Sequence, residues 1–205
     1  MEKRNLTLLT DLYELTMMNG YYLKGMTDEV AVFDVFFRRK ELITYSLAAG
    51  LEQVVDYVLG LNFGEEEIAY LKKLNVFDEG FLNYLKNLKF SGDIYSVPEG
   101  TMVFPGEPIL TVKAPVIEAQ LIETAILNMI NHQTLIATKS AKVCRAAQGD
   151  NVMEFGLRRA QGPDAGIYGA RAAIIGGCNS TSNVLAGKMF DVPVSGTHAH
   201  SWVMN

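Results

Sequence analysis

The feature that most constrains the fold of this 205-residue chain is an alternation of strand-like and helix-like segments after residue 150. In order, these are a strand at 152–155, a polar loop at 157–166, a helix at 168–175, a short segment near Cys178, a helix to about Phe190 and a strand at 192–194. A β-α-β-α-β series favours parallel strands joined by right-handed crossovers. The sequence therefore predicts an α/β unit here, in which three strands leave one sheet edge bare.

Polar segments follow these predicted strands at 156–159, 180–183 and 197–201. Because the carboxyl ends of parallel strands lie at the same edge of a sheet, we expect the three segments to converge. They supply guanidinium, hydroxyl, amide and imidazole groups. The sequence therefore predicts a polar site at this edge.

The first 147 residues predict an α+β domain that includes a long connecting helix and precedes the β/α units at 148–205. The expected elements are a helix from Thr7 or Thr10 to about Tyr22, a strand at 30–37, helices at 46–59, 65–74 and 78–87, strands at 93–97, 101–104 and 109–113, and a helical region from Pro115 to about Ala147. The first strand is mostly apolar, which predicts burial on both faces. Turns rich in Pro and Gly separate the three short strands, which predicts a small antiparallel sheet.

Composition and charge restrict the class of protein. The chain is 49% hydrophobic and 20% charged, as expected of a globular domain, and its net charge of −5 gives no support to general nucleic-acid binding. No segment approaches the ~20 apolar residues of a membrane span, and the N-terminus lacks a signal-peptide pattern. Cys144 and Cys178 are too few for a disulfide framework or a zinc site, so both are expected to be buried, reduced thiols. A cytoplasmic protein without nucleic-acid or membrane partners is expected.

Two of the polar segments each allow two interpretations. Arg158 and Arg159 could grip a phosphate or carboxylate, or could bond loop carbonyls and pair with Asp164. The run 180–183 precedes a helix, so one of its hydroxyls is expected to cap that helix. Capping does not exclude an anion at the same helix N-terminus.

The histidines of the last segment are the third candidate. His200 could act as a general base, nucleophile or proton shuttle, or it could be a core histidine bonded to a backbone carbonyl. His198 and His200 would share one side of a continuing strand, but the absence of a nearby carboxylate or Cys argues against zinc. Tyr13 and Asp11, two apart on a helix, do not face each other, and periodicity predicts a core position for Tyr13.

Several motifs in order along the chain resemble those of nicotinate phosphoribosyltransferases. They are TDLY at 10–13, FRR at 37–39, FPGEP at 104–108, EFGLRRAQGPD at 154–164, SNVLAG at 182–187 and GTxAHS at 196–201. The resemblance runs from near residue 6 to the last residue. It implies a type II phosphoribosyltransferase-like fold, with an N-terminal α/β domain followed by an irregular α/β barrel, of which 148–205 would supply the first, incomplete part.

The resemblance also implies an ATP-dependent ligase of NAD salvage that works as a homodimer. Such enzymes join nicotinate to 5-phosphoribosyl 1-diphosphate, and release nicotinate mononucleotide and diphosphate. His200 would be phosphorylated by ATP, and the phosphoimidazole could organise the diphosphate and Mg²⁺. His198 falls at a variable position, for which no chemical role is expected.

The resemblance assigns further residues to substrate. Tyr13 of the partner subunit and Phe155 would sandwich the pyridine ring, and Arg38 or Arg39 would meet phosphates across the dimer. The remaining residues expected at the substrate site are Asp11, Gly156, Arg158, Ser182, Thr197 and Ser201. The related nicotinamide-using enzyme carries Asp at the position of Ser182, where its carboxylate would repel nicotinate. Neutral Ser182 therefore favours the acid, and disfavours the nicotinamide- or quinolinate-using relatives.

One departure from the family follows His200. The family's later strands carry another ring-binding Arg, an acidic ribose-binding segment and a glycine-rich phosphate loop, and none of these follows here. We therefore expect the 205-residue polypeptide to be inactive alone, as a non-catalytic fragment or as one half of a split enzyme.

Overall fold

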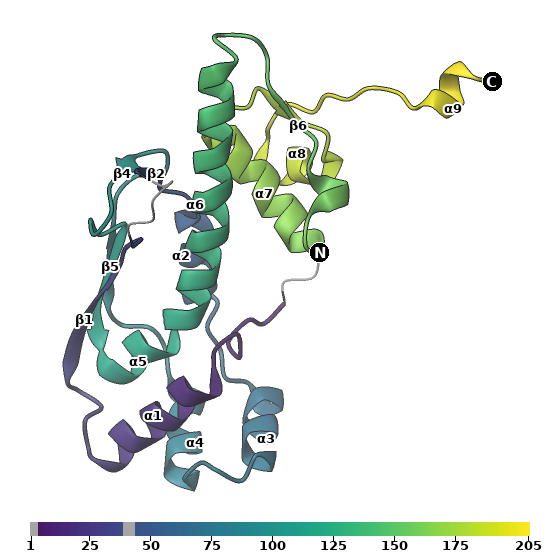
Figure 1. Ribbon diagram of the computed structural model, residues 1–205. Coiled ribbons are helices and arrows are strands. Elements are labelled where there is room, and N and C mark those ends of the chain that lie inside the picture. Colours follow the sequence, from purple (N-terminus) through teal and green to yellow (C-terminus); the bar gives the residue numbers. More distant parts are fainter. Residues whose placement is uncertain (1–3, 39–43) are drawn as a thin grey trace. The chain divides into compact units, whose positions relative to one another are not determined.

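The computed structural model describes residues 4–38 and 44–205 and combines helices with strands, as the predicted α/β class requires (Figure 1). The chain divides into two compact units. The first comprises Met1–Arg38, Leu51–Val97 and Gly106–Met129, and the second Arg39–Gly50, Pro98–Pro105 and Ile130–Asn205. Each unit thus draws on three separate stretches of sequence. The division of the sequence into domains at 1–147 and 148–205 stays a prediction.

An antiparallel sheet in the order β1-β5-β3 forms part of the first unit. Its strands are β1 (Val30–Val35), β5 (Leu110–Pro115) and β3 (Asp93–Ser96). The predicted burial of the first strand on both faces is wrong, because Val30 and Val32 are 61% and 58% exposed. In the part of the chain that the structure describes, β5 is the one strand paired with β1, which thus lies at the sheet edge, and apolar side chains are common on protein surfaces.

Helices complete the first unit. They are α1 (Leu12–Leu23), α2 (Leu51–Leu59), α3 (Glu65–Lys73), α4 (Glu79–Asn87) and α5 (Val116–Leu121). The Asp78 carboxylate caps α4 by accepting a 2.7 Å hydrogen bond from the Gly80 N–H. Apolar residues from these helices and from β5 form the core, including Met18, Val54, Leu71, Phe81, Leu85, Leu110, Ile117 and Leu121.

The predicted helix at 46–59 is correct only in its second part. Residues 46–47 form β2 (Ser46–Leu47), and the helix begins after Gly50, whose φ of +109° is a conformation that favours glycine. β2 pairs with β4 (Met102–Val103) in the second unit. The prediction that 101–104 joins the other two short strands in one sheet is therefore wrong.

The predicted helical region from Pro115 consists of two helices. α5 ends at Leu121, and α6 (Glu123–Ala146) follows after Ile122. From Ile130 onward α6 belongs to the second unit, where Ala137 packs with Ala49 and Ala172 in a small apolar cluster. None of the helices described is both long and apolar enough to cross a membrane.

The β/α units predicted after residue 150 are present. β6 (Met153–Glu154) and β7 (Ser180–Thr181) pair in parallel, with α7 (Pro163–Ile175) between them in sequence. α8 (Val184–Phe190) follows, and Val194 forms a parallel bridge with Thr181. The helix α7 begins earlier than predicted, because Pro163 occupies its first turn, where a missing N–H costs nothing.

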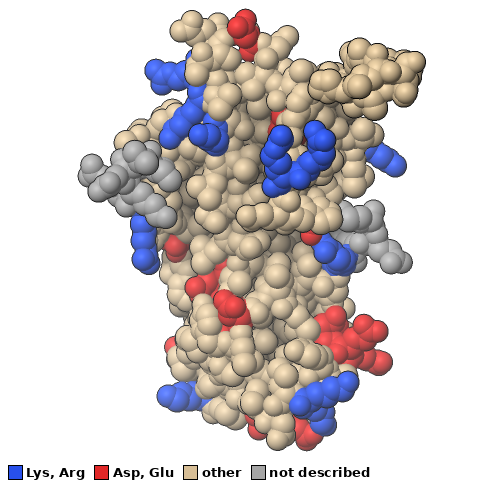
Figure 2. Space-filling model, turned by 45° about the vertical axis from the view of Figure 1, so that its right-hand side comes forward, with Lys and Arg blue, Asp and Glu red and all other residues tan. Residues whose placement is uncertain are grey.

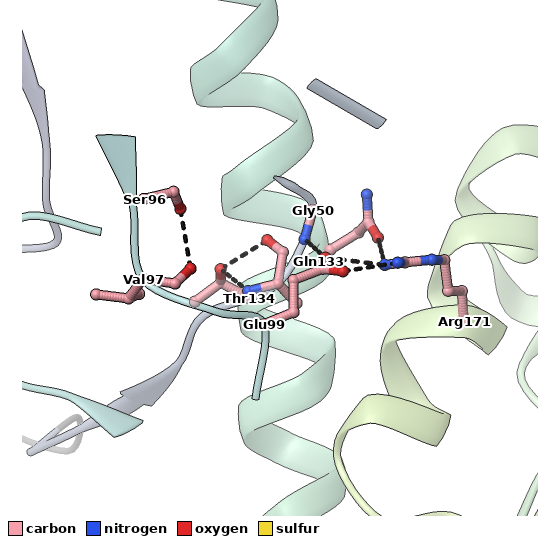
Figure 3. Close-up of polar contacts among 8 residues, drawn as sticks. Gly50, Ser96, Val97, Glu99, Gln133, Thr134 and Arg171 are labelled. Carbon is pink, nitrogen blue, oxygen red and sulfur yellow. Dashed lines mark hydrogen bonds and ion pairs between the residues drawn. The ribbon is translucent and has the colours of Figure 1, made fainter. Parts of the chain in front are cut away.

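A largely buried ion pair joins several elements of the second unit (Figure 3). Arg171 of α7 donates through Nη1 and Nη2 to the two carboxylate oxygens of Glu99, at 2.9 and 2.6 Å. Glu99 also accepts a 2.6 Å hydrogen bond from the Gly50 N–H, and Arg171 contacts Gln133 of α6 at 3.4 Å. The side chains of Arg171 and Glu99 are only 12% and 19% exposed. This bidentate pair fixes the turn before β4 against α7.

Candidate functional site

The carboxyl ends of β6 and β7 lie side by side. Glu154 and Thr181 are paired, and the Ser182 N–H donates a 3.0 Å hydrogen bond to the Glu154 carbonyl. The predicted third strand also reaches β7, since Val194 bridges Thr181 and the Ser195 N–H donates a 3.0 Å hydrogen bond to the Thr181 carbonyl. Phe155 and Ser182 therefore leave the strands at the same edge, as the sequence predicts.

A carboxylate that received no predicted role joins these strand ends. Glu154 accepts a 2.6 Å hydrogen bond from the Thr181 hydroxyl and another from the Gly156 N–H. Thr181 is buried, and its hydroxyl in turn accepts from the Asn183 N–H at 3.0 Å. The sequence signal for Glu154 is a carboxylate two residues before a glycine, the spacing of a local side-chain turn.

The run 180–183 caps α8, but through a different group than predicted. The Asn183 side chain accepts from the Ala186 N–H at 3.1 Å, whereas a hydroxyl was expected to cap. The Asn183 amide also donates to the Gly166 carbonyl at 3.1 Å. Asn183 thus anchors the start of α8 to α7, and the partly buried Ser182 lies between Thr181 and this anchor.

The residues after β6 are accessible. Phe155 and Gly156 are exposed, and Arg158 and Arg159 lie on an exposed 3-10 turn, Leu157–Arg159. Accessible guanidinium groups beside a strand end are chemically suited to an anion. Their role in binding phosphate or carboxylate stays a prediction.

The histidine segment does not join this cluster. Thr197, His198, His200 and Ser201 are all exposed, and Figure 1 shows α9 (His200–Val203) away from β6, α7 and α8. In α9 the N–H of Trp202 donates to the carbonyl of Ala199, and the N–H of Met204 donates to the carbonyl of His200, so both of these hydrogen bonds are local. The expected convergence of all three loops is therefore wrong for the third loop in this structure.

The alternatives for His200 can also be compared with the structure. A core position is wrong because His200 is exposed, and the strand does not continue to it because α9 begins there. It is His132 whose ring nitrogen lies 3.2 Å from a backbone carbonyl, that of Ala165. Among residues 4–38 and 44–205, no three His, Cys, Asp or Glu side chains are grouped so that they could hold a metal ion.

A second polar cluster lies in the first unit, where α1 meets the start of α6. Asp11 accepts a 3.1 Å hydrogen bond from the Thr124 hydroxyl, and the Tyr13 hydroxyl lies 3.4 Å from carboxylate oxygens of both Glu14 and Glu123. The predicted core position of Tyr13 is wrong, since Tyr13 is 49% exposed. The apolar face of α1 instead buries Leu15 and Met18.

Glu14 is the buried centre of this second cluster, and sequence reasoning missed it. Its carboxylate is 0% exposed and accepts from the Thr124 N–H at 3.2 Å, from the Thr124 hydroxyl at 2.9 Å and from Thr10. Burial raises the pKa of Glu14; hydrogen bonds from Thr124 oppose this rise, and the charge of Glu123 adds to it. Glu14, which belongs to α1, thus accepts a hydrogen bond from the Thr124 N–H, which lies in the first turn of α6 and has no partner within that helix.

The other predicted residues lie apart from these clusters. Arg38 is exposed just after β1, and Arg39 lies outside the described residues. Cys178 is buried, which raises the pKa of its thiol to about 11, while Cys144 is only partly buried, 3.9 Å away between sulfur atoms. Burial is thus confirmed for Cys178 alone. On the face in Figure 2, basic side chains occur in separate groups with uncharged and acidic surface between them.

Comparison with known proteins identifies relatives along nearly the whole chain. Residues 8–131 match the nicotinate phosphoribosyltransferase (NAPRTase) N-terminal domain. The chain is 49% identical over 201 residues to nicotinate phosphoribosyltransferase of Bacillus subtilis (strain 168), covering 97% of this chain and 41% of the relative. It is 45% identical over 203 residues to that of Caenorhabditis elegans, covering 96% and 36%.

Solved structures give the same result for the fold. Human nicotinic acid phosphoribosyltransferase superposes with a TM-score of 0.86 at 38% identity, over 95% of this chain and 40% of that chain. Nicotinate-nucleotide pyrophosphorylase from Pyrococcus furiosus shares the fold, with a TM-score of 0.77 at 24% identity over 98% and 44%. The chain thus spans about two fifths of the length of these relatives. Because the family domain matches more than half of this chain, the chain belongs to the nicotinate phosphoribosyltransferase family.

Proposed function

We propose that this chain supplies the nicotinate-binding part of an enzyme that joins nicotinate to 5-phosphoribosyl 1-diphosphate, as a step of NAD salvage. The observation that carries the proposal is the alignment of Phe155 and Ser182 at the ends of two paired parallel strands. An exposed aromatic ring beside a polar backbone edge suits a flat pyridine ring that carries a carboxylate.

The neutral side chain at 182 supports nicotinate over nicotinamide. A carboxylate at this position would repel the nicotinate carboxylate and accept from a carboxamide instead. Exposed Arg158 supplies a positive charge three residues after Phe155. We therefore propose that Arg158 attracts the nicotinate carboxylate or a phosphate of the co-substrate.

ATP coupling through His200 is a further part of the proposal. The exposed imidazole of His200 can be reached by the γ-phosphate of ATP, with ADP as the leaving group. We propose Thr197 and Ser201 as hydroxyl ligands beside it. Since His200 lies away from the strand-end cluster, the proposal requires segment 196–201 to adopt another position in the working enzyme. Mg²⁺ would be held largely by phosphate oxygens, as this ion prefers, and would neutralise their charge.

Tyr13 is proposed to contribute from a partner subunit. Its ring is exposed and its hydroxyl is held near Glu14 and Glu123, so the ring is positioned while its faces remain available. Asp11, two residues before Tyr13 at the start of α1, contacts Thr124 of the same cluster. A homodimer would bring Tyr13 and Arg38 of one subunit to the Phe155 site of the other.

The test measures enzymatic turnover by the whole protein that the gene encodes. Purified protein is incubated with nicotinate, 5-phosphoribosyl 1-diphosphate, ATP and Mg²⁺, and nicotinate mononucleotide is measured by chromatography. Product formation that is lost in the Phe155→Ala variant supports the proposal. Absence of product in the unmodified protein, or equal use of nicotinamide, contradicts it.

ATP coupling has its own readout. Incubation with γ-³²P-labelled ATP is expected to label the protein at an acid-labile, base-stable site. His200→Ala should abolish this label, whereas His198→Ala, two residues away, should keep it. Label that survives in His200→Ala contradicts the proposed phosphohistidine.

A further inference from the structure

We infer that Glu154 and Thr181 are positioning residues for nicotinate recognition, acting together through the hydrogen bond that joins β6 to β7. This inference rests on the proposed function, and goes beyond it by assigning the orientation of Phe155 and Ser182 to a partly buried contact between two residues that are not proposed to touch substrate. Neither residue is a proposed ligand.

Phe155 and Ser182, the residues proposed to bind nicotinate, each lie between two residues that take part in this group of hydrogen bonds. Phe155 lies between Glu154, whose carboxylate accepts from Thr181, and Gly156, whose N–H donates to the same carboxylate. The backbone on both sides of the Phe155 ring is thus tied to one carboxylate. The position of the Phe155 ring therefore depends on the hydrogen bonds that the Glu154 carboxylate accepts.

Ser182 is held in the same manner. Its own N–H donates to the Glu154 carbonyl at 3.0 Å, Thr181 precedes it, and Asn183 follows with its N–H donated to the Thr181 hydroxyl at 3.0 Å. The Thr181 hydroxyl thus serves both as a donor to Glu154 and as an acceptor from Asn183. One hydroxyl links the backbone around Phe155 to the backbone around Ser182.

Both oxygens of the Glu154 carboxylate accept hydrogen bonds from the chain itself. Hydrogen bonds from the Thr181 hydroxyl and the Gly156 N–H use one lone pair on each carboxylate oxygen. Both donors hold the carboxylate against the strand ends. A hydrogen bond to a charged acceptor is stronger than a neutral one, and the donor residue, Thr181, is itself buried.

The test compares steady-state kinetics of four variants of the protein expressed as its gene encodes it. Glu154→Gln keeps the shape but removes the charge, and Thr181→Val removes the hydroxyl. Thr181→Ser restores the hydroxyl as a rescue. Thr138→Val is the matched control, because Thr138 is also buried, donates to the Thr134 carbonyl at 2.6 Å and accepts from the Leu47 N–H at 2.9 Å.

We expect Glu154→Gln and Thr181→Val to raise the KM for nicotinate about tenfold, the effect of losing one charge-assisted hydrogen bond. The KM for 5-phosphoribosyl 1-diphosphate should stay unchanged, and Thr181→Ser and Thr138→Val should match the unmodified protein. This split separates positioning from a general loss of folded protein, which would lower the rate without changing either KM.

Two results overturn the inference. If the unmodified protein is active and Glu154→Gln and Thr181→Val leave the KM for nicotinate unchanged, the positioning role is wrong while the proposed function stands. If Thr181→Val does not fold, Glu154→Gln alone decides in the same way. If the unmodified protein forms no nicotinate mononucleotide, the proposed function fails and this inference fails with it.

Discussion

The Thr181 hydroxyl of β7 donates a 2.6 Å hydrogen bond to the Glu154 carboxylate of β6, at the point where both strands end. Two neighbouring parallel strands are usually joined by backbone hydrogen bonds alone. Here a side-chain contact adds to them where the strands are only two residues long. It thereby compensates for a short ladder at the edge where the proposed nicotinate ligands emerge.

Replacing Ser182 by Asp should weaken the use of nicotinate by the enzyme. Ser182→Asp places a carboxylate beside the site of the nicotinate carboxylate, and like charges at close range repel each other. We expect kcat/KM for nicotinate to fall at least about tenfold, the equivalent of ~1.4 kcal/mol, while nicotinamide use rises or is unaffected. Ser182→Asn, which has a similar shape without the charge, is the control. Unchanged kcat/KM for nicotinate in Ser182→Asp would sink the charge argument.

Breaking the Arg171–Glu99 pair should strongly destabilise the second unit. Glu99→Gln removes the carboxylate that the largely buried Arg171 guanidinium contacts through two hydrogen bonds, and breaking such a pair costs about 3 kcal/mol of unfolding free energy. The double variant Glu99→Gln/Arg171→Met should lose less than the sum of the two single changes. The exposed pair Lys72–Glu79 is the control, and Lys72→Met should have no measurable effect. Denaturant unfolding measures all of these, and additive effects would contradict the coupling.

Stability should depend on pH through Glu14. Because its folded pKa is raised above the unfolded value, the protonated form favours folding, and this contribution is lost as the pH rises through the folded pKa. Glu14→Gln cannot titrate. The unfolding free energy of the unmodified protein minus that of Glu14→Gln should therefore decrease as the pH rises above the ordinary Glu value. A difference that is constant or increases over this pH range contradicts the raised pKa.

Gly169 within α7 and Gly176 just after its last residue should respond oppositely to replacement by alanine. A Cβ on Gly176 would lie 2.5 Å from the Ala137 carbonyl oxygen and 2.6 Å from the Ser140 Cβ, so Gly176→Ala should destabilise the protein by about 1–3 kcal/mol. A Cβ on Gly169 would make an ordinary contact of 3.6 Å with His132, so Gly169→Ala should stabilise the helix by up to about 1 kcal/mol. Thermal unfolding of both variants distinguishes the two effects. Equal stability of the two would contradict the close approach of α6 to Gly176.

The sequence predicted well what depends on local order. The parallel β6 and β7 followed from the alternation of elements, and Phe155 and Ser182 were correctly expected to share an edge. This succeeded because right-handed crossovers and the direction of parallel strands restrict the topology to few choices.

What depends on long-range contacts was missed. Nothing local to Leu47 indicates that it pairs with Met102, and the exposure of β1 depends on its place at a sheet edge. Glu14 and Glu154 were missed as central residues because their partners Thr124 and Thr181 are distant in sequence. A carboxylate held by a residue of another element carries no periodic signal of its own in the sequence.

The most direct measurement is a crystal structure of the protein, expressed as its gene encodes it, with nicotinate bound. The account predicts that the pyridine ring contacts the Phe155 ring, that its carboxylate lies within hydrogen-bond distance of Ser182, and that Glu154 remains bonded to Thr181. Nicotinate bound without contact to Phe155 or Ser182 would contradict the central claim.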